Sequence, residues 1–527
     1  MGVVKCHVRS AGPEPERQQR IALHCLTMNG GSPSPEWRPR TLFASLPLLL
    51  TLLGLLLAIG QFLYNRSLWL DEALLALNIL DRSIPELMTP LNNDQVAPLL
   101  FLVFEKVFST LLPATEHGLR ILPLLCYAVG SFAFLGIVRS LFKDTPTRIF
   151  AVSLFVLNGN LIYYASEVKQ YIGDVAVANV IILLVLRYTS TGRGLHLLGA
   201  FALIATWFSS VTPIVVVTAF VHLLACRYRK GELRWSSSKV LLAWAVLWVL
   251  AFLVYYVIAV HDHPAQESMR RFWLSAQGLV PNDPFSALFY HAVYDRVVMV
   301  FTQLLPFGSI NAYALLVLVI IGCITSLHDD RRTILVLSGT PILLHLLLAV
   351  LHLYPFETRL ILYLIPAVIL IAAQGFQKCM ELLPGDRNAI RQWGVAVCLP
   401  LLLAVTFVRS GYPMDRQEIR SCLEFIVKNA MTNDRILVDP GAGPACTYYE
   451  RINDYDGLPI IHIGQSHTAP YAHLSDNGDP RGGIWFVFND LHPTENNMLL
   501  AQLNSKGYRC TAQHHASGAH AYRYLIP

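Results

Sequence analysis

The feature of this sequence that most constrains its fold is a series of apolar runs long enough to cross a lipid bilayer. Runs of about 20 residues with few charges recur from residue 41 to residue 409. The hydrocarbon core of a bilayer is about 30 Å thick and a helix rises about 1.5 Å per residue, so each run has the length of a transmembrane helix. The pattern therefore predicts a chain that crosses a membrane many times.

Eleven spans are predicted, which makes the fold class a polytopic α-helical membrane protein. The composition agrees, since 54% of the residues are hydrophobic and only 14% are charged, against about 25% charged in soluble domains. The fifth and sixth runs are the shortest. The predicted spans lie near 41–63, 118–142, 146–164, 168–188, 195–209, 211–227, 238–260, 312–328, 333–353, 360–380 and 391–409.

Lysine and arginine residues in the connections predict how the chain is oriented. Cytoplasmic loops of membrane proteins carry an excess of these residues, and the densest group falls at 227–234. This places the N-terminus inside, and an odd number of spans then places the C-terminal region outside. Residues 1–40 are polar and Pro-rich, without the apolar core of a signal peptide. They are predicted to be a disordered cytoplasmic tail, with Met28 as an alternative start.

Two long outer loops interrupt the predicted membrane module, residues 41–410. The first, 64–117, contains apolar-faced helices at 70–80 and 97–112 that are too short to span a bilayer. We expect these helices to lie at the interface or to cover the end of the bundle. The second outer loop is 261–311.

From about Met414 the pattern changes to short alternating strands and helices. Helices are expected at 418–429 and 493–507, and the strands are expected in the segments RILVDP, LPIIHI, GIWFVF and AYRYLI. This alternation predicts a small extracytoplasmic α/β domain at 414–527. The segment DPGAGPA resembles a phosphate-binding loop between a strand and a helix, but without a complete glycine motif it is interpreted as a turn.

The stretch SLWLDEALLALNILDRS, at the end of the first span, holds the first candidate site residues. Asp71 and Glu72 lie just outside the membrane beside Trp69, an aromatic interfacial anchor. Paired acids at this position suit a general base that serves a lipid-borne substrate. The alternative is that both acids begin an interfacial helix, whose positive N-terminal end favours negative charge.

The connection between the third and fourth spans, NLIYYASEVKQYIGDVAVAN, falls on the same predicted side. It contains Glu167, Lys169, Tyr171 and Asp174, which are candidate substrate- or phosphate-binding residues. A carboxylate inside a span costs about 2.5–3.5 kcal/mol, so Asp174 is expected to have a partner or a role. The alternative is an ordinary charged loop in which Asp174 pairs with Lys169 or with another helix.

Three arginines on the same predicted side are candidates for binding a phosphate. Arg359, in YPFETRLILYLIP, begins the tenth span, and a guanidinium there is well shaped to hold a phosphate through two hydrogen bonds. Arg120, at the start of the second span, and Arg270, in the second outer loop, share this hypothesis. Each of them has the alternative role of an arginine extending from a helix end towards water.

Metal and nucleic-acid sites are not predicted. His261 and His263 are weak candidate metal ligands, because histidines at the end of a span more often interact only with solvent. The cysteines and the other histidines show no zinc-binding spacing. The basic residues form no continuous patch, which argues against a nucleic-acid partner. No cofactor is required, although a divalent metal is a minor alternative.

Several of these motifs together resemble the bacterial branch of the glycosyltransferase family 39 and dolichyl-phosphate-mannose-protein mannosyltransferase-like superfamily. This superfamily has the GT-C membrane fold and includes the aminoarabinose transferase of lipid A and the rhizobial lipopolysaccharide transferases. The resemblance covers about 68–366. It rests on LWLDEALLALNIL, QVAPLLFLVFEKVF, HGLRILPLL, IYYASEVKQY and YPFETRLILYLIP. The segment QVAPLL departs from the His-Pro-Pro element of many relatives.

The resemblance implies a glycosyltransferase of the bacterial inner membrane that takes its sugar from a polyprenyl-phosphate carrier. The acceptor would be a hydroxyl group of a lipid, glycan or protein on the outer face of the membrane. Asp71 would act as the general base, basic residues would bind the lipid phosphate, and direct displacement would invert the anomeric centre. The C-terminal domain is not shared across the superfamily, so acceptor docking and simple stabilisation both stay open for it.

A protein of another class is the alternative. A lipid or polysaccharide transporter, a flippase or a non-catalytic scaffold would also have many spans. Transporters often have repeated halves and a binding site at the membrane midplane, whereas the acids of this chain gather at one end of the predicted spans.

Overall fold

The computed structural model describes residues 39–525, except for 113–114, 233–234, 282, 305–307, 329–331, 383–387, 410, 454–459, 463–481 and 491–492. The chain divides into two units, Met1–Ser45 and Leu46–Pro527. Within the first unit the described residues are 39–45, the beginning of helix α2. The predicted disordered tail at 1–40 therefore lies almost entirely outside the described residues.

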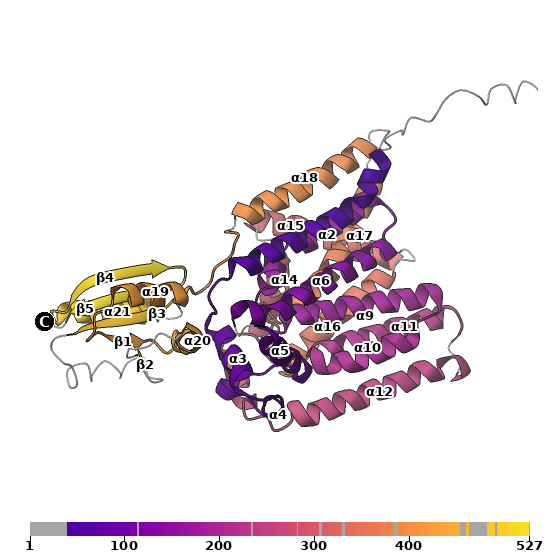
Figure 1. Cartoon of the computed structure of the whole chain (residues 1–527). Helices are drawn as coiled ribbons and strands as arrows, with labels where there is room; N and C mark the ends of the chain where they lie inside the picture. Colours follow the sequence, from indigo (N-terminus) through magenta and orange to yellow (C-terminus); the bar gives the residue numbers. More distant parts are fainter. Residues whose placement is uncertain are drawn as a thin grey trace, which may run out of the picture. The chain divides into compact units, whose positions relative to one another are not determined.

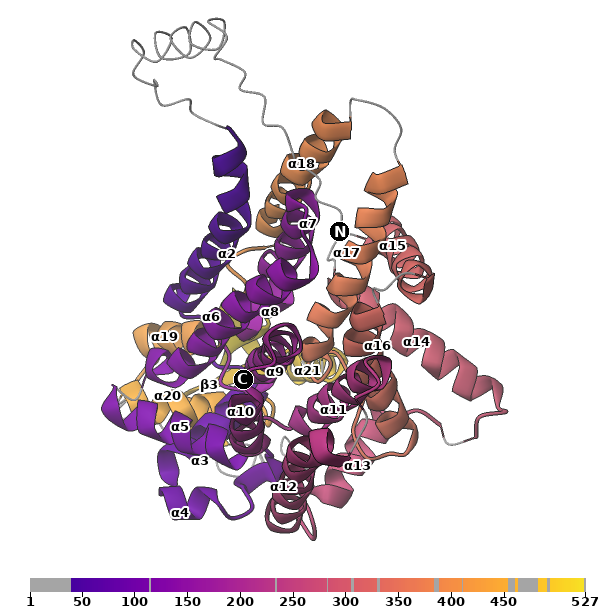
Figure 2. The same cartoon turned by 90° about the vertical axis from the view of Figure 1, so that its right-hand side faces the viewer.

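The chain from α2 to α11 is helical, and each helix is joined to the next by a short connection (Figure 1). Within it α9, α10 and α11 pack side by side, and α6 packs against α9 (Figure 2). The helices are α2 (Pro39–Tyr64), α3 (Leu70–Asp81), α4 (Ile84–Leu87), η1 (Asn92–Asp94), α5 (Leu99–Leu111), α6 (Glu116–Leu141), α7 (Thr145–Val156), α8 (Gly159–Tyr164), α9 (Tyr171–Thr191), α10 (Leu195–Phe208) and α11 (Thr212–Arg229).

The helical region continues to residue 409 and encloses the second long loop. In that loop the structure has two helices that the sequence did not predict, α13 and α14, and α14 carries the charged residues Asp295 and Arg296. The helices are α12 (Trp235–Ala259), α13 (Gln266–Ser275), α14 (Ala287–Leu304), α15 (Gly308–His328), α16 (Arg332–Val350), η2 (Leu362–Leu364), α17 (Ile365–Leu382) and α18 (Asn388–Arg409).

Every predicted span is helical, but two of them are not single α-helices. The run at 146–164 is broken after Val156, where the Asn158 side chain accepts a hydrogen bond from Leu161 N (3.1 Å) and starts α8. An asparagine followed by glycine favours a new helix start over continuation of the old helix. The run at 360–380 begins as η2 before it becomes α17.

Six helices within the described residues are long and apolar enough to cross a membrane, so the count of eleven spans stays a prediction. The six are Ser45–Tyr64, Glu116–Leu141, Tyr171–Thr191, Ser238–Ala259, Arg332–Val350 and Leu362–Leu382. Four shorter apolar helices accompany them, at Thr145–Val156, Leu195–Phe208, Tyr313–Leu327 and Cys398–Arg409.

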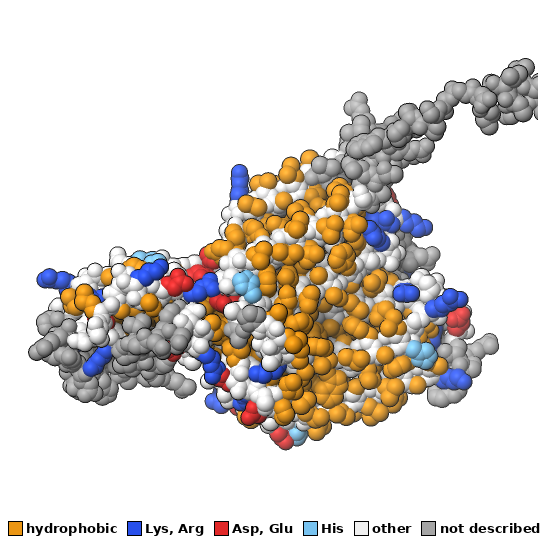
Figure 3. Space-filling view, viewed as in Figure 1, with side chains coloured by type: hydrophobic (Ala, Val, Ile, Leu, Met, Phe, Trp, Pro, Cys, Tyr) orange, Lys and Arg blue, Asp and Glu red, His pale blue; other side chains and the backbone are white. Residues whose placement is uncertain are grey.

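On the face seen in Figure 3, apolar side chains cover most of the surface of the helices. Leu56 of α2, Val257 of α12 and Leu343 of α16 are each more than 60% exposed. Soluble monomers rarely expose an apolar surface of this extent. Together with the long apolar helices, this surface identifies a polytopic helical membrane protein.

Two glycines allow α15 and α17 to approach each other closely. A Cβ added to Gly322 would collide with the backbone of α17, and one added to Gly375 would collide with the backbone of α15. Small residues at such crossings are typical of helix packing in membranes. Helices there are held together by van der Waals contacts, and small residues let the two backbones come close enough to form them. The contact fixes α17, the helix that follows Arg359.

The C-terminal region forms a five-stranded sheet in the order β2-β1-β3-β5-β4. Strand β1 is parallel to β2 and β3, whereas β5 is antiparallel to β3 and β4. The β4–β5 hairpin turns at Gly518, whose φ of 63° is in the region that favours glycine. The elements are α19 (Ile419–Asn429), β1 (Arg435–Val438), α20 (Gly443–Asn453), β2 (Ile460–His462), β3 (Gly483–Asn489), α21 (Pro493–Ser505), β4 (Arg509–Ala516) and β5 (Ala519–Leu525).

The four predicted strands and both predicted helices of this region are present, but β4 and α20 were not predicted. Residues 509–511 of β4 are exposed, so the strand lacks a strong apolar alternation. Helix α20 follows the DPGAGPA turn, and it packs against α3 of the membrane module (Figure 1). That the region is an independent, extracytoplasmic domain stays a prediction.

Candidate active site

The candidate site forms where four connections meet at the beginning of α3. These are the connection 65–69, the segment before α5 that contains Gln95, the connection 165–170 between α8 and α9, and the segment 354–361 before η2. Asp71 and Glu72 are both in the first turn of α3, where the positive end of the helix dipole favours carboxylates. Because consecutive helix positions differ by about 100°, the two side chains enter different surroundings.

Asp71 is held between two cations. Arg359 Nη1 donates to Asp71 Oδ2 (2.5 Å), and Lys169 Nζ lies 3.2 Å from Oδ1. Gln95 Nε2 donates to the same Oδ1 (3.3 Å) and its Oε1 accepts from Lys169 (2.7 Å). The Asp71 side chain remains 20% exposed and that of Arg359 18%. The mouth cluster of Asp71, Gln95, Lys169 and Arg359 is thus partly open to a ligand.

The charges of the mouth cluster set its protonation. Burial by itself would raise the pKa of Asp71, but the Lys169 ammonium and the Arg359 guanidinium outweigh it and lower that pKa to about 2. Burial lowers the pKa of Lys169, and the Asp71 carboxylate opposes that change. As long as both cations are in place, Asp71 is a carboxylate with little affinity for a proton.

Arg359 is surrounded by aromatic rings and by a fixed backbone segment. Its Cζ lies 5.8 Å from the ring centre of Trp69, 5.7 Å from that of Tyr171 and 5.6 Å from that of Trp273. The segment that carries Arg359 is held by Arg296 of α14, which forms an ion pair with Glu357 (3.0 Å). These contacts hold the Arg359 guanidinium in one orientation, directed towards Asp71.

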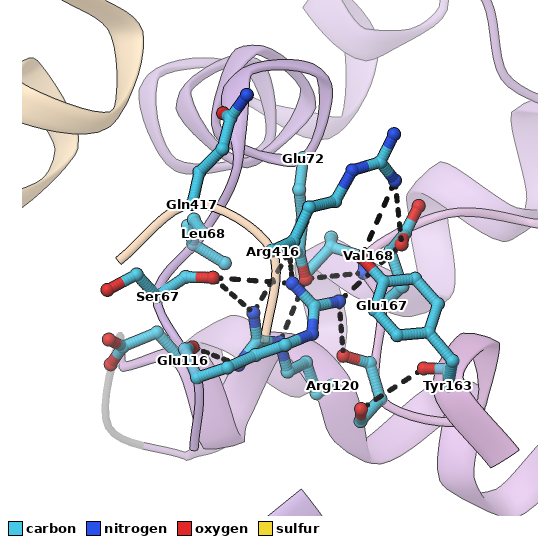
Figure 4. A network of polar contacts seen from close by, with 12 residues as sticks. Ser67, Leu68, Glu72, Glu116, Arg120, Tyr163, Glu167, Val168, Arg416 and Gln417 are labelled. Carbon is cyan, nitrogen blue, oxygen red and sulfur yellow. Dashed lines mark hydrogen bonds and ion pairs between the residues drawn. The ribbon is translucent and has the colours of Figure 1, made fainter. Parts of the chain in front are cut away.

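Glu72 is fully buried and all of its acceptor positions are in use (Figure 4). Arg120 Nε donates to Oε1 (2.8 Å) and Nη2 to Oε2 (2.9 Å). Arg66 Nη1 also donates to Oε2 (3.0 Å), and Val168 N donates to Oε1 (3.0 Å). The arrangement ties α3 to α6 and to the connection before α9.

Glu167 is the second fully buried carboxylate of this end of the bundle. Arg66 Nη2 lies 3.5 Å from its Oε2, and Arg416 Nη1 lies 4.0 Å from the same atom. Burial raises the pKa of Glu167, the Arg66 guanidinium opposes this, and the Glu72 carboxylate adds to it. Its Oε1 has no hydrogen-bond partner among the described residues.

The structure brings Asp71, Lys169, Tyr171 and Arg359 together but not the other predicted residues. Arg120 is buried against Glu72, and Asp174 lies inside α9, where Ser209 Oγ donates to its Oδ1 (2.6 Å). Arg270 is exposed on α13 and pairs with Glu267 (3.2 Å). Asp174 and Arg270 agree with their alternatives, a carboxylate bonded outside its own helix and an arginine that extends into solvent. Arg120 fits neither of its predicted roles, because its side chain is buried and paired with Glu72 instead of reaching a phosphate or water.

The candidate metal ligands are also separate from the mouth cluster. His261 pairs with Asp262 (2.9 Å) and is exposed, whereas His263 Nδ1 accepts from Ala265 N (3.2 Å). Within the part of the chain that the structure describes, no group of three His, Cys, Asp or Glu side chains is arranged to bind a metal.

Sequence reasoning missed several residues of the site, above all Arg66, Gln95 and Arg416. Arg66 follows the first span and could be mistaken for a cation at the membrane interface, although its nearness to Asp71 and Glu72 was a usable signal. Gln95 is in the segment that departs from the family pattern. Arg416 belongs to the C-terminal region, and nothing in the sequence indicates that it lies 3.3 Å from the ring centre of Trp69.

Comparisons with known proteins give structural likenesses only, because no protein-family model and no curated protein matches the chain. ArnT from Cupriavidus metallidurans bound to undecaprenyl phosphate is similar over 92% of this chain and 97% of that one, with 13% identity and a TM-score of 0.48. Its apo state gives the same coverage, 12% identity and 0.49. The Archaeoglobus fulgidus oligosaccharyltransferase in its apo form gives 90% and 74% coverage, 11% identity and 0.45.

Proposed function

We propose that this protein is a GT-C type membrane glycosyltransferase that moves a sugar from a polyprenyl-phosphate donor to an acceptor hydroxyl. The observation that carries the proposal is the mouth cluster, in which one carboxylate and two cations converge beside the apolar surface of a helical membrane protein. A lipid-borne phosphate needs the cations, and an attacking hydroxyl needs the base. The motif resemblance at LWLDE and YYASEVKQY supports the same reaction.

In the proposed reaction the acceptor oxygen attacks the anomeric carbon of the donor sugar. A new carbon–oxygen bond forms as the bond from the anomeric carbon to the phosphate oxygen breaks, and the polyprenyl phosphate leaves with the electron pair. Asp71 takes the proton of the acceptor hydroxyl. Arg359 and Lys169 stabilise the negative charge that develops on the departing phosphate. Displacement from the opposite side of the ring inverts the anomeric centre.

Binding of the donor phosphate is proposed to activate the base. In the structure Arg359 and Lys169 are bound to Asp71, so a phosphate that recruits them must weaken these ion pairs. When Arg359 and Lys169 also bind the phosphate, they stabilise the Asp71 carboxylate less. The effect of burial then outweighs that of the cations, and the pKa of Asp71 rises towards a value suitable for a base. The donor would therefore bind before the acceptor can be deprotonated, which restricts turnover to the enzyme with donor bound.

Glu72 and Arg120 are proposed to be structural, in contrast to the catalytic and phosphate-binding roles hypothesised from the sequence. Every oxygen of Glu72 already accepts from Arg66, Arg120 or Val168, and the Arg120 side chain is almost completely buried. A catalytic base needs a free lone pair, and a phosphate ligand needs an accessible guanidinium. Asp71 and Arg359 retain the partial exposure that these roles require.

The test is sugar transfer in liposomes by the wild type and by Asp71→Asn, with a panel of undecaprenyl-phosphate sugars as donors. We expect a loss of at least about a hundredfold, since a general base contributes about 10²–10⁴-fold. Asp94→Asn, which changes an exposed acid of the same loop, should leave transfer unchanged. Transfer by Asp71→Asn at the wild-type rate would refute Asp71 as the base. Lipid translocation without transfer would favour a flippase.

A further inference from the structure

The connection that leads into α3, residues 65–69, is a buried stretch of chain without helical structure. Residues 66–69 are all buried. Backbone groups in such a position must have hydrogen-bond partners inside the protein, because water does not reach them. Trp69, the residue that precedes the helix, provides no side-chain cap for α3. The partners therefore come from elsewhere in the chain.

Side chains of the C-terminal region supply the acceptors for two N–H groups of this stretch and for the first N–H group of α3. Ser67 N donates to Glu418 Oε1 (2.8 Å), and the Ser67 hydroxyl donates to Glu418 Oε2 (2.9 Å). Leu68 N donates to the Tyr449 hydroxyl (2.9 Å) and Leu70 N donates to Gln417 Oε1 (3.0 Å). Gln417 thus acts as the N-terminal cap of α3, although it is 347 residues away in the sequence.

The carbonyl groups of the same stretch are bound as well. Arg420 Nη2 donates to Asn65 O (2.5 Å), and Arg120 Nη1 donates to Arg66 O (2.7 Å). Arg416, which comes from the same C-terminal segment as Gln417, covers the Trp69 ring. The C-terminal segment 416–420 therefore binds an N–H group and a carbonyl group of the connection.

The C-terminal segment that binds the connection is itself held against the membrane helices. Gln61, near the end of α2, forms two hydrogen bonds with the backbone of Met414, each of 2.8 Å. The Tyr412 hydroxyl donates to Leu57 O (2.9 Å), and Arg451 of α20 forms an ion pair with Asp81 at the end of α3. These contacts hold the C-terminal segment against the connection from both sides.

We infer that the C-terminal region is part of the catalytic centre, in which Gln417, Glu418 and Tyr449 are positioning residues that fix the start of α3 and thereby aim Asp71. The inference rests on the proposed function. Leu70, whose N–H is capped by Gln417, immediately precedes Asp71, so a shift of the helix start moves the base directly. A displacement of about 1 Å at a reacting group can cost about a hundredfold in rate.

The experiment uses full-length protein with Gln417→Ala or Glu418→Ala. The matched control is Glu424→Ala, which removes an exposed acid from the same helix as Arg420. Hydrogen exchange of the peptide 66–73 should accelerate about tenfold in the two test variants, because each removes a hydrogen-bond acceptor from the N–H groups at the start of α3. In sugar transfer, kcat should fall about 10–100-fold while the donor KM stays within about twofold. Glu418→Gln, which keeps one acceptor oxygen, should recover most of the rate.

Two outcomes would overturn the inference, and neither depends on Asp71 being the base. Unchanged exchange of 66–73 in both test variants would show that the C-terminal side chains do not hold the connection. Accelerated exchange with a wild-type kcat would show that holding the connection does not position the active site. Failure of the proposed function is seen separately, as the absence of sugar transfer by the wild type, whereas full transfer by Asp71→Asn would refute only the role of Asp71 as the base.

Discussion

Asp71 and Glu72 are adjacent in the sequence, but their surroundings give them different chemistry. Asp71 is partly exposed and is bound by two cations that we propose a donor phosphate recruits, whereas Glu72 is enclosed by Arg66, Arg120 and Val168. The sequence indicated the position of both acids and of Arg359. The family resemblance implied that Asp71 is the base, but the burial of Glu72 among arginines could not be predicted, because Arg120 is 48 residues from Glu72 and only tertiary packing brings the two together.

Glu72→Gln is expected to damage the fold more than the chemistry. Replacing the carboxylate leaves the buried Arg120 guanidinium without an acidic partner and leaves Arg66 with Glu167 alone, and breaking a buried ion pair costs about 3–5 kcal/mol. We expect a clear fall in the thermal unfolding midpoint, measured by dye-based scanning in detergent, and a smaller fall for Asp71→Asn, whose carboxylate is partly exposed. Equal midpoints for Glu72→Gln and the wild type would contradict the structural role of Glu72.

Arg359→Ala is expected to weaken the use of the donor. The loss of a charge-assisted hydrogen bond to phosphate is worth about 1.5–3 kcal/mol, so the donor KM should rise about tenfold or more. Arg270→Ala is the matched control, because that arginine is exposed and pairs only with an acid of its own helix in the described structure. A donor KM that responds to Arg270→Ala and not to Arg359→Ala would reverse the phosphate assignment.

At the scale of elements, apolar periodicity predicted the helices well because each long run has only one way to satisfy its backbone in a membrane. The prediction failed where a helix-starting residue or a group of charges interrupts an apolar run. Asn158 starts a new helix inside the third predicted span, and α14 was missed because its charges resemble those of a loop. Helix α20 was missed because Tyr448 and Tyr449 are buried against other parts of the chain, which a local pattern does not reveal.

The C-terminal sheet contains an ion pair that should make its stability depend on pH. Arg523 binds Asp434 through two hydrogen bonds, of 2.7 and 2.8 Å, and Trp485 Nε1 and Gly483 N donate to the same carboxylate. Burial opposes ionisation, but these donors lower the pKa of Asp434 to about 2. Because the folded-state pKa is below the ordinary value, the stabilisation is complete above about pH 5 and is lost progressively as the pH falls through 2.

Asp434→Ala should remove this dependence and destabilise the sheet by about 3–5 kcal/mol, since it leaves Arg523 buried and unpaired. Hydrogen exchange of the β3 peptide, followed from pH 7 to pH 3 and corrected for intrinsic exchange rates, measures both effects. The wild type should lose protection as the pH falls, whereas the variant should be poorly protected throughout. Equal protection of β3 in the two proteins would contradict this account of the sheet.

For the whole molecule, the contacts join two regions that the sequence treats as separate. Near Met414 the long apolar runs give way to short alternating strands and helices, and this change predicted a domain boundary there. In the structure, however, Gln417, Glu418 and Tyr449 bind the connection that enters α3. If Asp71 acts on the outer face of the membrane, the C-terminal region that is bonded to the start of α3 must lie on that face as well. A test of the topology of the chain is therefore also a test of where the site lies.

Reporter fusions placed after Gly231 and at the C-terminus test this topology. The last turn of α11 carries Arg227 and Arg229, and Lys230 follows it, so the positive-inside rule places this end in the cytoplasm. The C-terminus is expected outside, because the C-terminal region is bonded to the start of α3 and the proposed acceptor is extracytoplasmic. A fusion after Gly231 should therefore be active as a cytoplasmic reporter and one at the C-terminus as an external reporter. The same side for both would require an even number of membrane crossings between these points, and the model with five spans after residue 231 would be wrong.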